Sequence, residues 1–175
     1  MLFRKGVPLV FRAMKIAALE DLVLDLVGAG PMEDQWRKMA ELSGLGKRIR
    51  FHGKVPFSEV FRYYDNSDLF VFPSVNDAFG GQLLEACARG LPLLVLNHQG
   101  AGALVPDAVA WKVPVQSPDQ IVNDMATAMI ELSNSPERLA QMSRAAVEYA
   151  KTEIWLRRVQ RLSVLYKRSV VADSQ

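Results

Sequence analysis

Short apolar runs alternate, from Pro8 to about Leu96, with segments in which apolar residues recur at helical spacing. Apolar runs of about four to eight residues are typical of buried strands, and the longer period is typical of amphipathic helices. The pattern predicts strands at Leu22–Val27, Arg48–His52, Leu69–Phe72 and Leu91–Leu96. It predicts helices before and between them at Pro8–Ala18, Met32–Leu42, Pro56–Asp65 and Gln82–Arg89.

Beyond Pro114 only the helical period remains, and it predicts helices at Ser117–Leu132, Pro136–Ala150 and Glu153–Arg168. The first two open with Ser-Pro-Asp at Ser117 and with Ser-Pro-Glu at Ser135. In such openings the Ser side chain caps the helix, Pro fits the first turn, and the acid lies near the positive end of the helix dipole. Both helix starts are therefore expected to be capped by their Ser side chains.

Strands that alternate with helices of this length predict parallel βαβ units. The strands are near-continuous apolar runs, as expected when helices cover both faces of a sheet. The predicted fold class is α/β, with a Rossmann-like parallel sheet sandwiched by helices and a C-terminal helical tail. We expect a single domain over 1–175, with the sheet at about 1–115 and the tail at about 116–170. Ligands of such sheets bind beyond the carboxyl ends of the strands.

Composition limits the possible functions. Half of the residues are apolar and 23% are charged, which is typical of a folded globular domain. The net charge of +2 is too small to indicate a nucleic-acid partner. The single cysteine, Cys87, allows no internal disulfide, and no apolar run is long enough to span a bilayer. Without a signal-peptide pattern at residues 1–6, a cytoplasmic location is expected.

Basic residues gather toward the C-terminus, at Arg157, Arg158, Arg161, Lys167 and Arg168. A solvated helix face explains them most simply. A peripheral contact with the inner membrane surface or with a partner domain is the alternative.

Gly28 and Gly30 directly follow a predicted strand, which invites a dinucleotide-binding interpretation. That fingerprint needs a third glycine where this chain has Glu33, and an acid there would face a pyrophosphate. A nicotinamide or flavin cofactor is therefore not expected. The glycines still permit close approach of a ligand to the backbone, and a plain tight turn is an equal alternative.

The segment Pro73–Ala86 carries the densest chemistry. A strand ends there, a small polar loop follows, and Gly80-Gly81 open a helix whose first backbone N–H groups can bind an anion. Asp77 and Glu85 flank this opening, and carboxylates beside a phosphate site suit sugar hydroxyls. The simpler alternative makes Asp77 a loop acid or a helix cap and Glu85 a surface acid.

Other strand ends are less informative. A lone Lys such as Lys5 is usually solvated, and the loop around Val55 has a backbone that can pair with a flat ligand. Asn97, His98 and Gln99 can hydrogen-bond a ligand, although a satisfied loop histidine is the favoured interpretation of His98. His52 is expected to be structural. With two histidines, one cysteine and no cluster with ligand spacing, no metal is expected.

Taken in order, these segments resemble the C-terminal, donor-binding domain of the GT-B glycosyltransferases, and specifically glycosyltransferase family 4 of retaining enzymes. Arg4–Gly6 resembles the Lys-Gly step of that family, and Leu26–Pro31 resembles its Val-Gly-x-Gly-Pro step. Ile49–Pro56 resembles Val-x-Phe-x-Gly-x-Val-Pro, and Asp68–Ser74 resembles Asp-Leu-Phe-Val-x-Pro-Ser. Leu84–Pro92 resembles Leu-Glu-Ala-x-Ala-x-Gly-x-Pro.

The resemblance implies roles for individual residues. The family has two acids eight residues apart, matching Asp77 and Glu85; the first contacts the donor sugar and the second the nucleotide ribose. Lys5 matches the lysine that contacts the donor pyrophosphate, and the backbone around Val55 would pair with the base. Backbone groups at Gly80, Gly81, Gln82 and Leu83 would bind sugar and phosphate oxygens. The substrate-binding set is completed by Gly28, Gly30, Ala78 and Phe79.

This chain departs from the family pattern in three respects. Asp77 replaces the usual Glu, the family's arginine a few residues before the lysine is not matched because Arg4 directly precedes Lys5, and the N-terminal acceptor domain is expected to lie outside this chain. The resemblance implies transfer of a hexose from a nucleoside-diphosphate sugar to a glycan or lipid acceptor, without metal. The isolated chain is expected to bind nucleotide-sugar without turnover. A non-catalytic binding module and a hydrolase using Asp77 and Glu85 as an acid–base pair are the alternatives.

Overall fold

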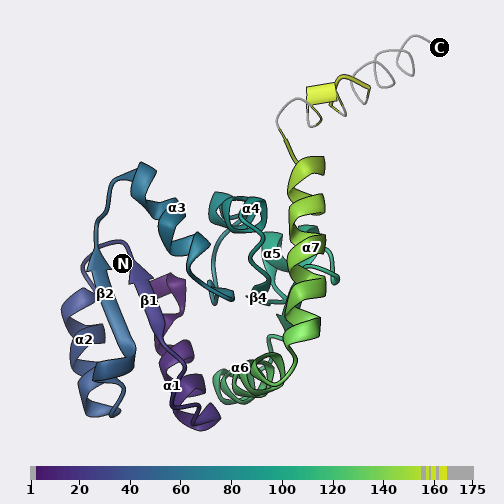
Figure 1. Cartoon of the computed structure of the whole chain (residues 1–175). Coiled ribbons are helices and arrows are strands. Elements are labelled where there is room, and N and C mark those ends of the chain that lie inside the picture. Colours follow the sequence, from purple (N-terminus) through teal and green to yellow (C-terminus); the bar gives the residue numbers. More distant parts are fainter. Residues whose placement is uncertain (1–2, 155–156, 158, 161, 165–175) are drawn as a thin grey trace.

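The computed structural model describes residues 3–154, 157, 159–160 and 162–164 (Figure 1). Within them the strands are β1 (Leu24–Val27), β2 (Ile49–Gly53), β3 (Phe70–Phe72), β4 (Leu93–Leu96) and β5 (Ala110–Val113). The α-helices are α1 (Val7–Ala17), α2 (Glu33–Leu42), α3 (Phe57–Asp65), α4 (Gly81–Ala88), α5 (Gln99–Leu104), α6 (Pro118–Ser133) and α7 (Pro136–Thr152). Short 3₁₀ turns, η1 (Phe3–Lys5) and η2 (Gly46–Arg48), precede α1 and β2.

The four predicted strands and the first six predicted helices are confirmed, with ends shifted by a few residues. Half of the predicted helix at Glu153–Arg168 lies outside the described residues. Two elements were not predicted: β5, and α5, which lies where a loop was expected. Strand β5 is short and carries Lys112 among its apolar residues, and Gly100 and Gly102 weaken the helical signal of α5.

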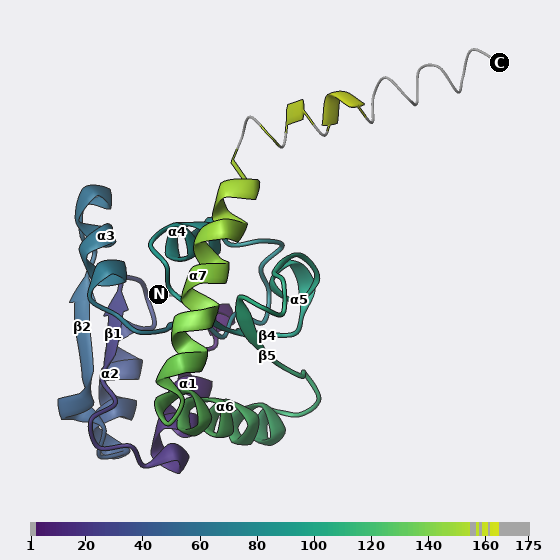
Figure 2. The same cartoon turned by 45° about the vertical axis from the view of Figure 1, so that its right-hand side comes forward.

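The strands form two parallel ladders. Strand β1 pairs with β2, in the register Leu24 to Ile49, and β4 pairs with β3 on one side and with β5 on the other. In Figures 1 and 2 the β1–β2 ladder with α2 lies on one side of the molecule, and β4 with α4, α5 and α7 lies on the other. The expected parallel α/β architecture is confirmed.

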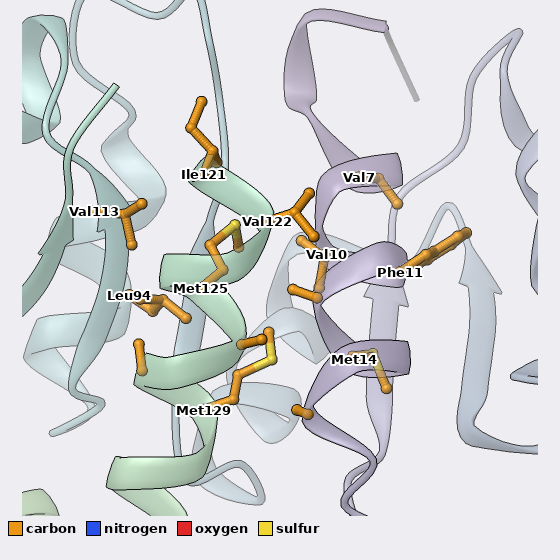
Figure 3. Packing of buried hydrophobic residues seen from close by; sticks show 14 of the residues in the cluster. Val7, Val10, Phe11, Met14, Leu94, Val113, Ile121, Val122, Met125 and Met129 are labelled. Atoms are coloured by element: carbon orange, nitrogen blue, oxygen red, sulfur yellow. The ribbon is translucent and has the colours of Figure 1, made fainter. Parts of the chain in front are cut away.

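Helices α1, α2 and α6 cover one face of both ladders with a single apolar cluster. Leu24 and Leu26 of β1 contact this cluster, as do Leu94 and Leu96 of β4. In Figure 3 the side chains of α6 point on one side toward Leu94 and on the other toward α1. Because α1 and α6 touch strands of both ladders through the same core, the two ladders belong to one layer.

The opposite face is covered unequally. A second apolar cluster packs α3, α4, α5 and α7 onto β3, β4 and β5, and it contains no residue of β1 or β2. On that face of the β1–β2 ladder, His52 lies 2.5 Å from the Asp25 carboxylate and its ring packs against Tyr63. His52 therefore has the structural role that was expected. Apolar packing on both faces, as predicted, is found for β4, whereas this face of β1 and β2 carries Asp25 and His52 and is contacted by Tyr63 of α3 without a buried apolar cluster.

The two Ser-Pro helix starts also differ. The Ser117 hydroxyl accepts a hydrogen bond from the Gln120 N–H at 3.2 Å, as predicted for an N-cap. Ser135 occupies the N-cap position of α7 but its side chain makes no capping hydrogen bond, because ψ of 68° departs from the extended value of about 160° found at Ser117. The predicted cap at Ser135 is therefore wrong. No helix among the described residues is long and apolar enough to cross a membrane.

Candidate functional site

The turn before α1 is fastened to the end of β3. The Arg4 carbonyl accepts a hydrogen bond from the Val75 N–H at 2.9 Å. Gly6 has φ of 65°, and a Cβ at this position would lie 2.0 Å from the Pro73 carbonyl oxygen. Only glycine fits both the left-handed conformation and this close approach. The Lys5-Gly6 step thus brings the side chains of η1 to the loop that follows β3.

Asp77 is the centre of this contact. Its carboxylate accepts hydrogen bonds from Arg4 at 2.7 Å and from Lys5 at 2.8 Å, and the Ser74 hydroxyl donates to it at 2.5 Å. The side chain is only 16% exposed. Burial raises the pKa of Asp77, but the hydrogen bonds from Lys5, Ser74 and Arg4 outweigh it and lower the pKa to about 2. We call Arg4, Lys5, Ser74 and Asp77 the Asp77 cluster.

The ring of Phe72 connects this cluster with the start of α4. The Lys5 ammonium lies 5.4 Å from the Phe72 ring centroid. A Cβ on Gly80 would lie 2.8 Å from Cζ of the same ring, so a side chain there would clash. The glycine therefore lets the start of α4 approach the same aromatic ring that Lys5 covers, and the lysine and the helix opening are neighbours, in the arrangement that the family resemblance implies.

The opening of α4 has no side-chain cap. Gly81 and Gln82 are exposed there, whereas the Leu83 side chain is fully buried and its N–H donates to the Gly80 carbonyl at 3.0 Å. The positive end of the α4 dipole thus coincides with two exposed residues. Such an opening is suited to anions.

Glu85 lies one turn farther along α4. It accepts a hydrogen bond from the Tyr64 hydroxyl at 3.1 Å, and its Oε1 lies 3.9 Å from the position of a Cβ on Gly81. Burial, with the adjacent Glu85 charge, raises the pKa of Tyr64, so the phenol stays protonated and donates. Glu85 is thus held beside the opening of α4 and is not a detached surface acid.

The loop before α4 is held by the start of α5. The Gln99 side chain accepts a hydrogen bond from the Asp77 N–H at 2.7 Å. Gln99 itself has φ of 47°, which is rare for a residue with a side chain. A Cβ on Gly100 would lie 1.6 Å from the Ala78 carbonyl oxygen, so Gly100 lets the loop with Ala78 and Phe79 pack directly on α5.

Sequence reasoning missed the parts that Arg4, Ser74, Tyr64 and Gln99 play. The family pattern gives Arg4 no role because it directly precedes Lys5, yet both side chains reach Asp77. His98, by contrast, is exposed at the N-cap of α5. Gln99 is one of three polar residues directly after β4, and this position is the sequence feature that could have indicated its role.

The remaining predicted residues lie at the ends of β1 and β2. The Gly28 N–H donates to the Gly53 carbonyl at 2.7 Å, and Gly28 has φ of 124° with no atom within 4 Å of the position of a Cβ. The Gly30 carbonyl accepts the Glu33 N–H at 3.1 Å, and Val55 is half-buried. No hydrogen bond recorded among the described residues joins these three to the Asp77 cluster. Among the same residues, no three His, Cys, Asp or Glu side chains are grouped so that they could hold a metal ion.

Comparisons with known proteins agree with the geometry. Residues 1–149 match the family of Glycosyl transferases group 1. The D-inositol 3-phosphate glycosyltransferase of Corynebacterium glutamicum is 32% identical over 148 residues, which are 84% of this chain and 34% of that protein. The GtfA subunit of the UDP-N-acetylglucosamine–peptide N-acetylglucosaminyltransferase of Streptococcus gordonii is 31% identical over 140 residues, 77% of this chain and 27% of that protein. The chain thus spans about a third of the length of the curated relatives it matches.

Solved structures share the fold. A chain of the GtfA/B complex superposes with a TM-score of 0.82 at 26% identity and covers 96% of this chain and 34% of that one. Anabaena HepE in complex with UDP gives a TM-score of 0.80 at 18% identity, covering 96% of this chain and 46% of that one, a likeness of fold alone. The family match over most of the chain, its relatives and the α/β architecture lead to one assignment: the chain belongs to the Glycosyl transferases group 1 family and has the fold of one half of a GT-B glycosyltransferase.

Proposed function

We propose that this chain is the donor-binding half of a retaining glycosyltransferase that moves a hexose from a nucleoside-diphosphate sugar to a hydroxyl of a glycan or lipid. The observation that carries the proposal is that Lys5 and the uncapped opening of α4 both lie at the ring of Phe72, while Arg4 and Lys5 share the Asp77 carboxylate. Two cations and a helix N-terminus form an electropositive site that suits a diphosphate.

The chemistry follows from that charge. When the sugar leaves, negative charge develops on the departing diphosphate. Lys5, Arg4 and the dipole of α4 stabilise this charge electrostatically, which is what metal-free transfer requires. A diphosphate must share or replace the Asp77 carboxylate as partner of the two cations, because both already bind it. Asp77 is then available to accept hydrogen bonds from sugar hydroxyls.

Glu85 is proposed to bind the ribose. It lies one turn inside α4, and the Tyr64 hydroxyl occupies only one of its acceptor positions. The ends of β1 and β2, with Gly28, Gly30 and the backbone of Val55, are proposed to receive the base. The acceptor half is proposed to belong to the remaining length that full relatives have, or to a partner chain.

A hydrolase that uses Asp77 and Glu85 as an acid–base pair fits less well. The pKa of Asp77 near 2 keeps that carboxyl ionised at neutral pH, so it holds no proton to donate. Both of its oxygens also accept hydrogen bonds from Arg4, Lys5 and Ser74.

Calorimetry with a panel of nucleoside diphosphates tests the proposal. UDP is the first to try, because HepE was solved with UDP and GtfA is named for a UDP-sugar. We expect heat from at least one nucleotide at millimolar concentration, without turnover of acceptor. Absence of heat from every nucleotide would contradict the proposal.

Two variants separate the roles of the acids. With sugar-free nucleotide, Glu85→Ala should weaken binding by about tenfold or more, as expected for one lost charged hydrogen bond. Asp77→Ala should weaken it less, since its proposed ligand is the sugar. Equal losses, or the reverse order, would contradict the ribose assignment.

A further inference from the structure

Asp77 is held through its backbone as well as through its carboxylate. The carboxylate accepts hydrogen bonds from Arg4, Lys5 and Ser74. The Asp77 N–H donates to Oε1 of Gln99 at 2.7 Å. In the proposed function a diphosphate takes or shares the two cations, so their bonds to the carboxylate are weakened when the ligand binds. The bond to Gln99 involves neither cation and leaves both carboxylate oxygens available, so it can persist in the bound state.

Helix α5, which begins at Gln99, is fixed near both ends. At its start, a Cβ on Gly100 would lie 1.6 Å from the Ala78 carbonyl oxygen, so the helix packs directly on the loop that carries Asp77. At its end, the Leu104 carbonyl accepts a hydrogen bond from the Tyr149 hydroxyl of α7 at 2.9 Å. The backbone of Gln99 is therefore placed by packing that involves no ligand.

The backbone conformation of Gln99 indicates that its side chain is needed. Its φ of 47° lies in the left-handed region, which glycine adopts without strain and a residue with a side chain does not. The residue is exposed, so burial of an apolar stem does not explain a glutamine there. The bond to the Asp77 N–H does explain it, and strained residues of this kind gather at functional sites.

We propose that Gln99 is a positioning residue for recognition of the donor sugar and that it acts through the Asp77 N–H. It keeps Asp77 in place while the diphosphate takes Arg4 and Lys5, so that the carboxylate meets the sugar hydroxyls in a fixed position. Without this bond the sugar would have to order the loop as it binds, which lowers affinity. The inference rests on the proposed function and extends its sugar site to α5.

This role predicts a particular pattern of affinities. A free nucleotide has no sugar to offer Asp77, so its binding needs no fixed carboxylate. A nucleotide-sugar gains from Asp77 only what remains after the loop has been ordered. Loss of the Gln99 bond should therefore weaken binding of a UDP-sugar and leave binding of UDP nearly unchanged.

Substitutions of Gln99 can separate this role from a structural one. Gln99→Met keeps the length of the side chain and removes the acceptor, whereas Gln99→Glu keeps an acceptor and tests rescue. Gln99→Gly also removes the acceptor but relieves the left-handed backbone, so it must behave like Gln99→Met even if the latter folds poorly. Gln120→Met is the matched control, because Gln120 is an exposed glutamine at the start of α6 whose amide donates to Asp124.

The first measurement is hydrogen exchange of the Asp77 amide by NMR, on the ligand-free protein and with inorganic pyrophosphate. Gln99→Met and Gln99→Gly should speed this exchange by about tenfold or more in both conditions. Wild type, Gln99→Glu and Gln120→Met should agree with one another. Unchanged exchange in the variants that lack the acceptor overturns the proposal.

The second measurement is calorimetry with UDP, UDP-glucose and UDP-N-acetylglucosamine. The ratio of the Kd for UDP to the Kd for the tighter UDP-sugar should fall about tenfold in Gln99→Met and stay constant in Gln99→Glu and Gln120→Met. An unchanged ratio with faster exchange would leave Gln99 a structural role alone and overturn the proposal. If wild type binds none of the three compounds, the proposed function fails and this inference with it, whereas faster exchange would still show that Gln99 holds the loop.

Discussion

The two ladders of this domain differ in what covers them. The β3–β4–β5 ladder is packed on both faces, by α1 and α6 on one and by α4, α5 and α7 on the other. The β1–β2 ladder is packed by apolar residues on one face, and its other face carries the Asp25–His52 pair. One parallel layer thus contains both a fully buried and a half-buried region.

This difference determines where the fold can hold functional side chains in fixed positions. The Asp77 cluster, the opening of α4 and Gln99 all lie at the ends of β3 and β4, where neighbouring packing fixes each backbone segment. Gly28 and Val55, at the ends of β1 and β2, face open space or are half-buried. In the proposed function, the buried ladder holds the groups that stabilise the leaving diphosphate, and the half-buried ladder receives the base through its backbone groups.

The largest expected difference in stability is between core substitutions in the two ladders. Leu94→Ala removes a side chain with no exposed surface at the centre of the buried ladder, and should lower the free energy of unfolding by about 3–4 kcal/mol. Leu24→Ala, the matched change in the half-buried ladder, should cost about 1 kcal/mol. Urea unfolding of both variants measures the difference. Equal losses would show that the two ladders are equally well packed.

The next contrast uses two glycines with similar backbone conformation. Gly6 has φ of 65° and Gly44 has φ of 74°, so alanine is strained at both. Only at Gly6 does the added methyl group meet backbone, at 2.0 Å from the Pro73 carbonyl oxygen. Gly6→Ala should therefore cost about 3 kcal/mol and Gly44→Ala about 1 kcal/mol, by the same urea measurement. A larger loss at Gly44 would contradict the close packing of η1 on the end of β3.

The sequence predicted the alternation of strands and helices well, because each strand up to β4 is a recognisable run bounded by glycine, proline or polar residues. It missed β5, whose Lys112 interrupts a short apolar run, and α5, whose Gly100 packs on the Ala78 carbonyl. Tertiary contacts, which a local pattern does not contain, stabilise both elements.

The candidate site was predicted in part. The pairing of Lys5 with the opening of α4 was implied by the family resemblance and not by the residues alone, and both lie at Phe72. That Asp77 is bound by Arg4 and Lys5 was not predictable, since these partners are more than 70 residues apart in sequence. An interaction of that range depends on how η1 packs on β3, which no local pattern specifies.

The charges of the site give a pH-dependent prediction. The pKa of Asp77 is about 2 in the folded protein, below its ordinary 3.8, so ionisation of Asp77 stabilises the fold above about pH 4 and this contribution is lost as the pH falls through 2. It corresponds to about 2 kcal/mol at most. Asp77→Asn should thus be less stable than wild type by up to that amount at pH 5–7, and the gap should close near pH 2.

As a control, Asp119→Asn removes an exposed partner of Arg12 and should change stability by less than about 0.5 kcal/mol at neutral pH. A gap for Asp77→Asn that is constant from pH 6 to 2 would refute the assignment.

The smallest expected difference in stability is between cap substitutions in α6, which covers both ladders, and in α7, which covers one. Ser117 caps α6 through the Gln120 N–H, so Ser117→Ala should cost about 1 kcal/mol. Ser135 stands before α7 in the same Ser-Pro-acid sequence but makes no capping bond, so Ser135→Ala should cost only a few tenths of a kcal/mol. Because Ser, Pro and acid are shared, any difference between the variants reports the hydrogen bond rather than composition. Thermal unfolding of the two proteins side by side is the measurement, with a shift of about 2–4 °C expected for Ser117→Ala alone. If the two shifts are equal, the capping bond at Ser117 contributes nothing, and α6 is stabilised by its packing on α1 and β4 alone.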